Sequence, residues 1–422
     1  MKPSSVKKTT LSNGVRILTK TMPFVHSVSM GVWVNVGARD ESASENGLSH
    51  LIEHMIFKGT RKRTAFQIAK EFDAIGGHTN AFTSFENTCY HARVMDTHVD
   101  TMVNILTDIF LNSEFAEEEV IKERPVIFQE IGMVEDNPEE YVHVLSGSAF
   151  WGDNPLGRSI LGTRDNILAF TSEKIKAFFN RFYQPSHIVV AVAGNISHER
   201  IVEQVGPAFS AVNTGPGFPG RKTPEGYPQI KLHQRNLEQV HICLGTRGIS
   251  ITDPKRYSFS LLNTIFGGNM SSRLFQKIRE LRGLAYAVYS FISSYEDTGM
   301  FGAYVGVQAD KVRETVGLIM EEMRTLKKHP VDEAELKDAK NYTKGNLLLA
   351  SESVDNQMVR LAQNEINFGR SVPLQEIIDQ VEAITAADIG DLAVELFQED
   401  RLALTALGPL NGNESFADLL LT

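Results

Sequence analysis

The order of strand-like and helix-like segments in this chain occurs twice, once in each half. Each half opens with two short strand-like runs and continues into a helical pattern that ends on Ile-Phe, at Ile56-Phe57 and again at Ile265-Phe266. The strand-like runs are residues 15–18 and 28–34, with 229–232 and 240–245 as their counterparts. A repeat of this length predicts two domains of one fold, because each copy carries a full set of elements.

The later elements of the two halves also correspond. In each half a strand-like run precedes a long helix, and a strongly apolar run lies near the end. The pairs are 90–94 with 302–307, the helices 99–111 with 311–327, and 187–194 with 401–408. Strands that alternate with long helices in this way predict an α+β class. We expect domains at 1–212 and 227–422, joined by an exposed Gly- and Pro-rich linker at 213–226.

The first Ile-Phe helix contains the motif His50-Leu51-Ile52-Glu53-His54. On a helix, residues three and four apart share a face, so His50, Glu53 and His54 would point the same way. Two imidazoles at this spacing can hold one Zn²⁺, and a glutamate beside them can take a proton from water that the metal activates. This is the H-x-x-E-H signature, the reverse of the thermolysin order. The alternative is a chance pair of surface histidines near an acid.

The polar residues of this motif are separated by apolar ones, which is typical of a mostly buried helix. Buried His and Glu need partners, and a metal would provide one. A catalytic zinc usually takes three protein ligands, so a third ligand is required. The best source is the segment 123–131, where Glu123 and Glu130 lie two helical turns apart on one face. Glu53 is not needed as a ligand and is therefore the candidate general base.

These two segments together resemble the M16 family of zinc metallopeptidases, which includes the mitochondrial processing peptidase, insulysin and pitrilysin. By this resemblance His50, His54 and Glu130 hold one Zn²⁺ per chain, and Glu123 supports the histidines or the substrate. The alternative for Glu123 is a solvated helix acid. Further motifs follow in the family's order: Phe57-Lys58-Gly59-Thr60, Gly76-Gly77-His78-Thr79-Asn80-Ala81-Phe82-Thr83-Ser84, Pro155-Leu156-Gly157-Arg158, Ser272-Arg273-Leu274-Phe275 and Arg279-Glu280-Leu281-Arg282-Gly283-Leu284-Ala285-Tyr286. The likeness covers nearly the whole chain and is closest to bacterial single-chain relatives of the processing peptidase β subunit.

The resemblance also implies a fold and a different role for each half. Each domain is expected to be a mostly antiparallel sheet with helices packed on one face, as in processing peptidases and LuxS-like metallohydrolases. Aligning the two Ile-Phe dipeptides places Phe259, Leu262 and Asn263 opposite His50, Glu53 and His54, respectively. The second domain is therefore expected to lack the metal and to serve binding and architecture.

Candidate substrate-binding residues occur in the first half. Asn80-Ala81-Phe82-Thr83 combines polar and apolar residues near an expected sheet edge, where an extended peptide could add as a strand. An ordinary sheet strand is the alternative. The resemblance places an acid that recognises arginine at Glu140, but the second acid expected four residues later is Val144. This departure argues against a strict preference for arginine.

Two more candidates lie in the second half. Arg279 and Tyr286 match a family pair that contacts the substrate backbone. Because they are seven residues apart, they share a helix face only if the helix continues through Gly283. The alternatives are an interdomain salt bridge and a packed tyrosine.

Composition and charge narrow the range of partners. The formal net charge of −10 argues against nucleic acid, which needs a basic face, and weakly favours cationic peptides.

No run of about 18 apolar residues is present, so no membrane-spanning helix is expected. The basic N-terminus has no apolar core after it, so we expect no signal peptide and a cytoplasmic location. Cys89 and Cys243 lie in strand-like runs and are expected to be buried free thiols.

The sequence thus predicts a zinc-dependent endopeptidase that cleaves short or unfolded peptides, bound as an added strand in a chamber formed by two half-shells. Long single-chain relatives enclose the substrate with four such domains, so two chains are expected to pair, most simply as a homodimer. Arg279 and Tyr286 would then complete the partner's site. A non-catalytic partner subunit is one alternative, although such subunits usually lose part of the motif. A zinc-dependent small-molecule hydrolase is another, but it would leave the second half without a purpose.

Overall fold

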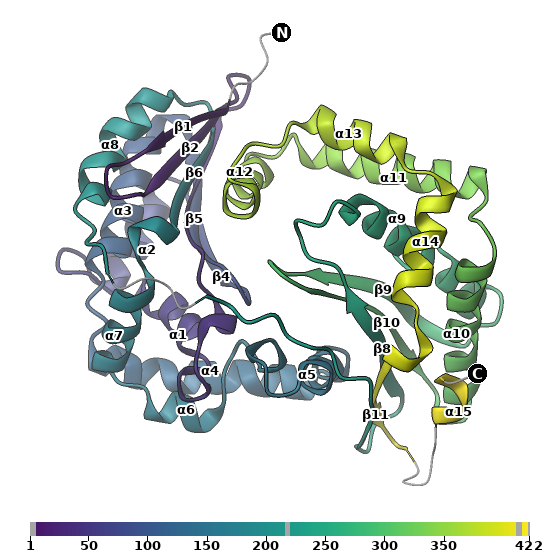
Figure 1. Cartoon of the computed structure of the whole chain (residues 1–422). Helices are drawn as coiled ribbons and strands as arrows, with labels where there is room; N and C mark the ends of the chain where they lie inside the picture. The colour runs from purple at the N-terminus through teal and green to yellow at the C-terminus, as the bar shows by residue number, and fades with distance from the viewer. Residues whose placement is uncertain (1–5, 216–219, 411–415, 421–422) are drawn as a thin grey trace. The chain divides into compact units, whose positions relative to one another are not determined.

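The computed structural model describes residues 6–215, 220–410 and 416–420. The chain divides into two units, each built on one β-sheet (Figure 1). The first unit contains Met1–Gly132, Arg158–Arg221 and Leu349–Ser371, and the second contains Met133–Gly157, Lys222–Leu348 and Val372–Thr422. Among the described residues, no helix is both long and apolar enough to cross a membrane.

Six strands form the sheet of the first unit, in the order β1-β2-β6-β3-β5-β4. They are β1 (Val6–Thr10), β2 (Arg16–Thr21), β3 (Ser27–Val34), β4 (His78–Thr83), β5 (Thr88–Met95) and β6 (Ile188–Gly194). Neighbouring strands are antiparallel except β2 and β6, which are parallel. β6 is buried along its whole length, in keeping with its continuous apolar sequence, and β4 forms one edge.

Most helices of the first unit pack against one face of this sheet. The helices of the unit are α1 (Leu48–Met55), α2 (Ala65–Ala74), α3 (Val99–Asn112), α4 (Glu117–Asp136), α6 (Arg164–Ala169), α7 (Ser172–Phe182), α8 (His198–Ser210) and α12 (Val354–Phe368). The main core lies between strand residues such as Ile17 and Val32 and helix residues such as Leu51, Ile105 and Phe178. This core holds α1 and α4 in place, and these two helices carry the candidate metal ligands.

α12 covers the opposite face of the same sheet (Figure 1). Side chains alternate along a strand, so Leu18 and Trp33 point away from the main core. They pack instead against Met358 and Leu361 of α12, and Trp33 Nε1 donates to Met358 Sδ at 3.2 Å. One helix from the last third of the chain thus completes the first unit.

The second unit has a five-stranded sheet in the order β7-β11-β8-β10-β9, in which only β7 and β11 are parallel. The strands are β7 (Ile230–Gln234), β8 (Val240–Gly248), β9 (Ala285–Ser294), β10 (Gly299–Val307) and β11 (Ala403–Gly408). The helices are α5 (Pro138–Trp151), α9 (Arg256–Phe266), a π-helix (Phe275–Glu280), α10 (Val312–Lys328), α11 (Glu333–Ala350), α13 (Leu374–Ala383), α14 (Ala386–Leu396) and α15 (Ala417–Leu420). α5 covers one face of this sheet, where Val142 packs with Cys243 and Tyr304.

The structure confirms the α+β class, the two mostly antiparallel sheets and the repeated order of elements. Cys89 and Cys243 are buried and free, as expected. α5 and α12 add to the expected arrangement, because each sheet has a second apolar face that one of them covers. The two units therefore differ from the predicted division at 1–212 and 227–422: α5 belongs to the second unit and α12 to the first. Part of the predicted linker 213–226 lies outside the described residues, at 216–219.

Candidate metal centre

α1 brings the histidines of the H-x-x-E-H motif onto one face. Its apolar residues, including Leu51 and Ile52, are fully buried in the main core. The helical spacing therefore turns His50, Glu53 and His54 to the other side, as the sequence predicts. His50 is buried and the other two are half-buried.

α4 supplies the two acidic residues. Val120 and Ile127 anchor this helix in the main core, two turns apart. Glu123 and Glu130 have the same spacing and share a second stripe of the helix. Glu123 is 5% exposed, whereas the side chain of Glu130 is 36% exposed.

His50, His54 and Glu130 converge on one point. Oε2 of Glu130 lies 3.6 Å from Nε2 of His50 and 3.5 Å from Nε2 of His54. One ligand atom from each of the three residues lies within 4.8 Å of the others. Ligands held at about 2.1 Å around a tetrahedral zinc lie about 3.4 Å apart, so the two measured separations fit that ion closely.

The protonation of His50 also fits a metal ligand. Burial, and then the charge of His54, lower the pKa of His50 to about 4, so its imidazole is neutral, as a metal ligand must be. Oε2 of Glu130 is buried and has no hydrogen-bond partner among the described residues. A buried carboxylate oxygen without a partner is costly, and a cation at this point would satisfy it. These residues therefore suit Zn²⁺, which takes nitrogen and oxygen ligands.

Glu123 supports a histidine. Its Oε1 lies 2.9 Å from Nδ1 of His54, and its Oε2 lies 2.6 Å from Nζ of Lys58. Burial raises the pKa of Glu123, but the bonds with His54 and Lys58 outweigh it and lower the pKa overall. For His54, burial lowers the pKa, yet Glu123 and Glu130 raise it overall. Of the two roles expected for Glu123, the geometry thus favours contact with a histidine, and its burial is inconsistent with a solvated helix acid.

Glu53 lies on the metal face without belonging to the three-residue cluster. Burial raises the pKa of Glu53, whereas hydrogen bonding to Thr83 at the end of β4 lowers it less strongly. The side chain of Thr83 also donates to the backbone oxygen of Ser49 at 3.4 Å. The end of the edge strand β4 therefore lies directly beside α1.

β4 carries the predicted substrate-binding segment. It is hydrogen-bonded to β5 on one side and forms the edge of the sheet on the other. Asn80 and Phe82 are exposed, whereas Ala81 packs against the main core. Phe82 makes an edge-to-face contact with Trp33, with ring centroids 5.3 Å apart. The segment therefore lies at a true sheet edge, and exposure alternates along residues 80–83.

Arg279 and Tyr286 adjoin each other in the second unit, but not on one helix. The π-helix ends at Glu280, Gly283 has a φ of +60°, and Tyr286 lies on β9. The guanidinium carbon of Arg279 lies 4.6 Å from the ring centroid of Tyr286 and 4.7 Å from that of Phe275. Tyr286 is 79% exposed, so the alternative of a packed tyrosine is wrong.

The other predictions for the second unit have mixed outcomes. Glu140 lies exposed on α5, and its proposed contact with arginine stays a prediction. α9, the counterpart of α1, buries Phe259 and Leu262. Within the described residues, the one group of three or more His, Cys, Asp or Glu side chains that could hold a metal lies in the first unit.

Two residues of the site were not assigned a role from the sequence. Lys58 is part of a family motif, but its contact with Glu123 depends on how α1 and α4 pack. Glu41 precedes the motif by nine residues and accepts hydrogen bonds from the start of α1. One feature of the sequence could have pointed to Glu41: it is an acid upstream of a helix whose N-cap residue, Gly47, has no side chain that could cap the helix.

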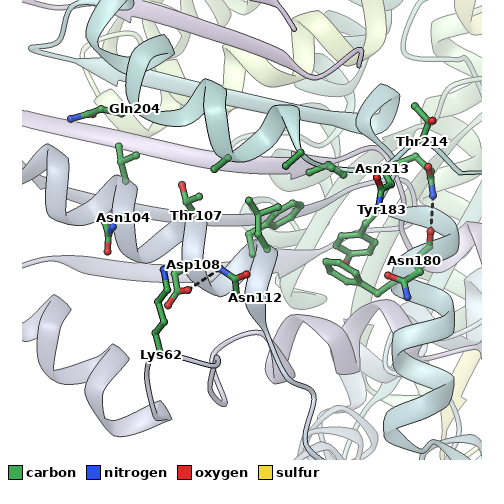
Figure 2. A pocket seen from close by; sticks show the side chains of 18 of the residues that line it. Lys62, Asn104, Thr107, Asp108, Asn112, Asn180, Tyr183, Gln204, Asn213 and Thr214 are labelled. Carbon is green, nitrogen blue, oxygen red and sulfur yellow. Dashed lines mark hydrogen bonds between the residues drawn. The ribbon is translucent and has the colours of Figure 1, made fainter. Parts of the chain in front are cut away.

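A separate cavity of about 1000 Å³ lies among α3, α7 and α8. In Figure 2, Lys62 and the hydrogen-bonded pair Asp108 and Asn112 lie at one side, and Asn180 and Thr214 lie at the other. No residue of the metal cluster lines this cavity. The cavity is therefore separate from the three candidate metal ligands.

Comparison with known proteins gives a family. The sequence model described as Insulinase (Peptidase family M16) matches residues 16–164, and the one described as Peptidase M16 inactive domain matches residues 169–343. The chain belongs to peptidase family M16. The first M16 match contains the whole metal cluster, and the second covers the half in which the structure has no such cluster among its described residues.

Bacterial M16 relatives match over almost the full chain. A protein of Bacillus subtilis called an uncharacterized zinc protease is 40% identical, over 97% of this chain and 99% of its own. A protein of Streptomyces coelicolor with the same description is 38% identical, over 97% of this chain and 91% of its own. Their names imply zinc as the metal of these relatives, in agreement with the ligand geometry here.

Two solved structures share the M16 fold of this chain. A protease from Helicobacter pylori has a TM-score of 0.90 at 21% identity and covers 96% of this chain and 100% of its own. A protein from Pseudomonas fluorescens described as a peptidase M16 inactive domain has a TM-score of 0.89 at 20% identity and covers 97% and 99%. At these identities the likeness concerns the fold alone.

Proposed function

We propose that this protein is a zinc-dependent endopeptidase that cleaves short or unfolded peptides. One observation carries the proposal: His50 and His54 face Oε2 of Glu130 at the separations expected around tetrahedral zinc, with Glu53 beside them and outside the cluster. One zinc ion per chain, held by these three residues, would activate a water molecule and polarise the scissile carbonyl. The M16 relatives described as zinc proteases support this choice of metal.

Glu53 is the residue that transfers a proton from the attacking water to the leaving amine. Its carboxylate accepts a proton from the attacking water and delivers it to the leaving amine. Hydrogen bonding to Thr83 holds this carboxylate against the end of β4. Glu123 holds His54 by Nδ1, which leaves Nε2 of that ring to face Glu130.

The peptide substrate follows from the edge strand. One side of β4 pairs with β5, so backbone groups on its other side are available to an added strand. Thr83 connects the end of β4 to Ser49 of α1, so a peptide along β4 would pass close to the metal cluster. Only an extended backbone can pair in this way, and folded proteins rarely present one. Exposed Asn80 and Phe82 would face substrate side chains.

We propose further that two chains pair as a homodimer and enclose the peptide in a chamber formed by two half-shells. Arg279, stacked on exposed Tyr286, would then contact the substrate backbone in the partner's site. Glu140, exposed on α5, would favour a basic residue, and the net charge of −10 favours cationic peptides.

The proposal is tested with one small disulfide-bonded protein in two forms, native and reduced with its thiols blocked. The purified enzyme should cut the unfolded form and leave the native form intact, because only the former supplies an extended backbone. The Glu53→Gln variant is the control for contaminating proteases and should cut neither form. Equal cleavage of the native and unfolded forms would contradict the conformational selectivity, and a wild-type protein that cuts neither form would contradict the proposed activity.

A further inference from the structure

Glu41 is a buried carboxylate whose hydrogen bonds are all directed at the start of the metal-binding helix. Glu41 as a whole is only 2% exposed. Oε1 accepts from the backbone N–H of Ser49 at 2.7 Å, and Oε2 accepts from the backbone N–H of Gly47 at 2.8 Å. Nδ2 of Asn46 also donates to Oε2, at 3.2 Å. Both carboxylate oxygens are thus engaged by the turn that begins α1.

This arrangement replaces an ordinary N-cap. The first N–H groups of a helix have no partner within the helix, and a Ser, Thr, Asp or Asn at the N-cap usually satisfies one of them. The N-cap of α1 is Gly47, which has no side chain and a φ of +104°. Glu41 reaches in from six residues upstream and binds the amides of Gly47 and Ser49 instead. Its negative charge also lies at the positive end of the helix dipole.

The cap is itself held on both sides. Nη1 of Arg158 donates to the backbone oxygen of Glu41 at 2.9 Å, and Asn46 donates to the backbone oxygen of Ser159 at 2.9 Å. A Cβ on Gly47 would lie 2.9 Å from Cα of Gly162, so a side chain at this position would collide with that loop. Burial raises the pKa of Glu41 to about 7, although its N–H donors lower it. The N–H donors thus offset part of the cost of burying this carboxylate.

The two histidines are oriented in different ways. His54 is held through its side chain, because Glu123 binds Nδ1 of the ring. Nδ1 of His50 has no hydrogen-bond partner among the described residues. His50 is the third residue of α1, one position after Ser49, whose amide Glu41 binds. The placement of His50 therefore depends on the first turn of the helix.

We propose that Glu41 is the positioning residue for His50: by fixing the first turn of α1, it aims the imidazole at the metal, as Glu123 does for His54 through a side-chain bond. This inference rests on the proposed function, since it assumes that His50 is a zinc ligand. Glu41 does not touch the metal or the substrate and acts only through the backbone of α1. Its removal should therefore change how well the metal is bound even where the protein remains folded.

The test uses the full chain with Glu41→Gln, which preserves size but turns an amide NH₂ towards N–H donors. Zinc affinity is measured by competition with a chromophoric chelator, and the geometry of the site by the visible absorption of the cobalt-substituted protein. We expect zinc to bind at least about 10-fold more weakly, the size of effect typical for groups that orient metal ligands. We also expect an altered cobalt spectrum.

The matched control is Glu365→Gln. Glu365 is another buried carboxylate of the first unit, but it lies on α12, where it pairs with Lys8 at 2.5 Å. This variant can lower the unfolding temperature, yet it should keep wild-type zinc affinity and the wild-type cobalt spectrum. Measurements are made below the unfolding transitions of both variants, so that metal affinity is compared between folded proteins.

The outcomes separate this inference from the proposed function. Wild-type zinc affinity and an unchanged cobalt spectrum in Glu41→Gln would overturn the role of Glu41, as would an equal loss in Glu365→Gln. Failure of the wild-type chain to bind zinc would instead contradict the proposed function. If Glu41→Gln does not fold, hydrogen exchange in the wild type replaces it. The amides of Gly47 and Ser49 should then be as protected as that of Leu51, and rapid exchange would refute the cap.

Discussion

Glu123 bridges His54 and Lys58, with Oε1 2.9 Å from Nδ1 of the imidazole and Oε2 2.6 Å from Nζ of the ammonium group. A carboxylate that accepts from Nδ1 fixes the tautomer in which Nε2 is free to bind a metal. Lys58 occupies the second oxygen, so the carboxylate cannot rotate away without losing an ion pair. The three residues form a chain that ends at the cluster of His50, His54 and Glu130.

The first prediction concerns this bridge. Glu123→Gln retains a possible acceptor for His54 but loses the charge that pairs with Lys58. We expect zinc affinity to fall by about 10-fold, with the fold intact. The measurement is chelator competition, and the control is Glu118→Gln, which removes the same charge from an exposed position of α4. Equal zinc affinities in the two variants would argue against a role for Glu123 in holding His54.

The second prediction concerns α12. Met358 is fully buried against Trp33, whereas Gln363 on the same helix is exposed. Met358→Asp places an unpaired charge in this contact and should destabilise the first unit by about 3 kcal/mol or more, whereas Gln363→Asp should stay within about 0.5 kcal/mol. Chemical denaturation followed by tryptophan fluorescence would report the difference. Similar midpoints for both variants would contradict the packing of α12 on the first sheet.

Much of the metal centre could be predicted from the sequence, because helical spacing alone places His50, Glu53 and His54 on one face and Glu123 in line with Glu130. The choice of these acids among many came from the family resemblance. Strand-like runs and the repeat likewise predicted the two sheets. In each case the signal is local, so it can be read without knowing how distant segments pack.

The rest depends on contacts between distant segments. The pattern of α12 predicts an apolar stripe but not which sheet it covers, and only the structure places Met358 on Trp33. From the sequence, Arg279 and Tyr286 share a face only if one helix continues through Gly283. In the structure the chain turns at Gly283, and the guanidinium group of Arg279 stacks on the ring of Tyr286. The turn arises because glycine readily adopts a positive φ.

The third prediction concerns the proposed dimer. Family resemblance implies that Arg279 and Tyr286 serve the site of the partner chain, so Glu53→Gln and Tyr286→Phe damage different parts of one shared site. Mixing the two inactive or impaired variants should raise activity above that of either parent, because each mixed dimer has one intact site and one doubly damaged site. Subunit exchange is checked with differently tagged chains. No recovery despite exchange would rule out sharing in trans, and an active monomer would remove the need for a dimer.

The central claim is that three residues hold zinc and a fourth performs the proton transfer. The most direct test is the zinc content and the peptide turnover of Glu53→Gln, measured on the same preparation beside Glu130→Ala. The account predicts that Glu53→Gln keeps one zinc ion per chain with turnover lost, whereas Glu130→Ala loses the metal, because only Glu130 belongs to the cluster with His50 and His54. An active Glu53→Gln, or equal loss of zinc from both variants, would contradict it.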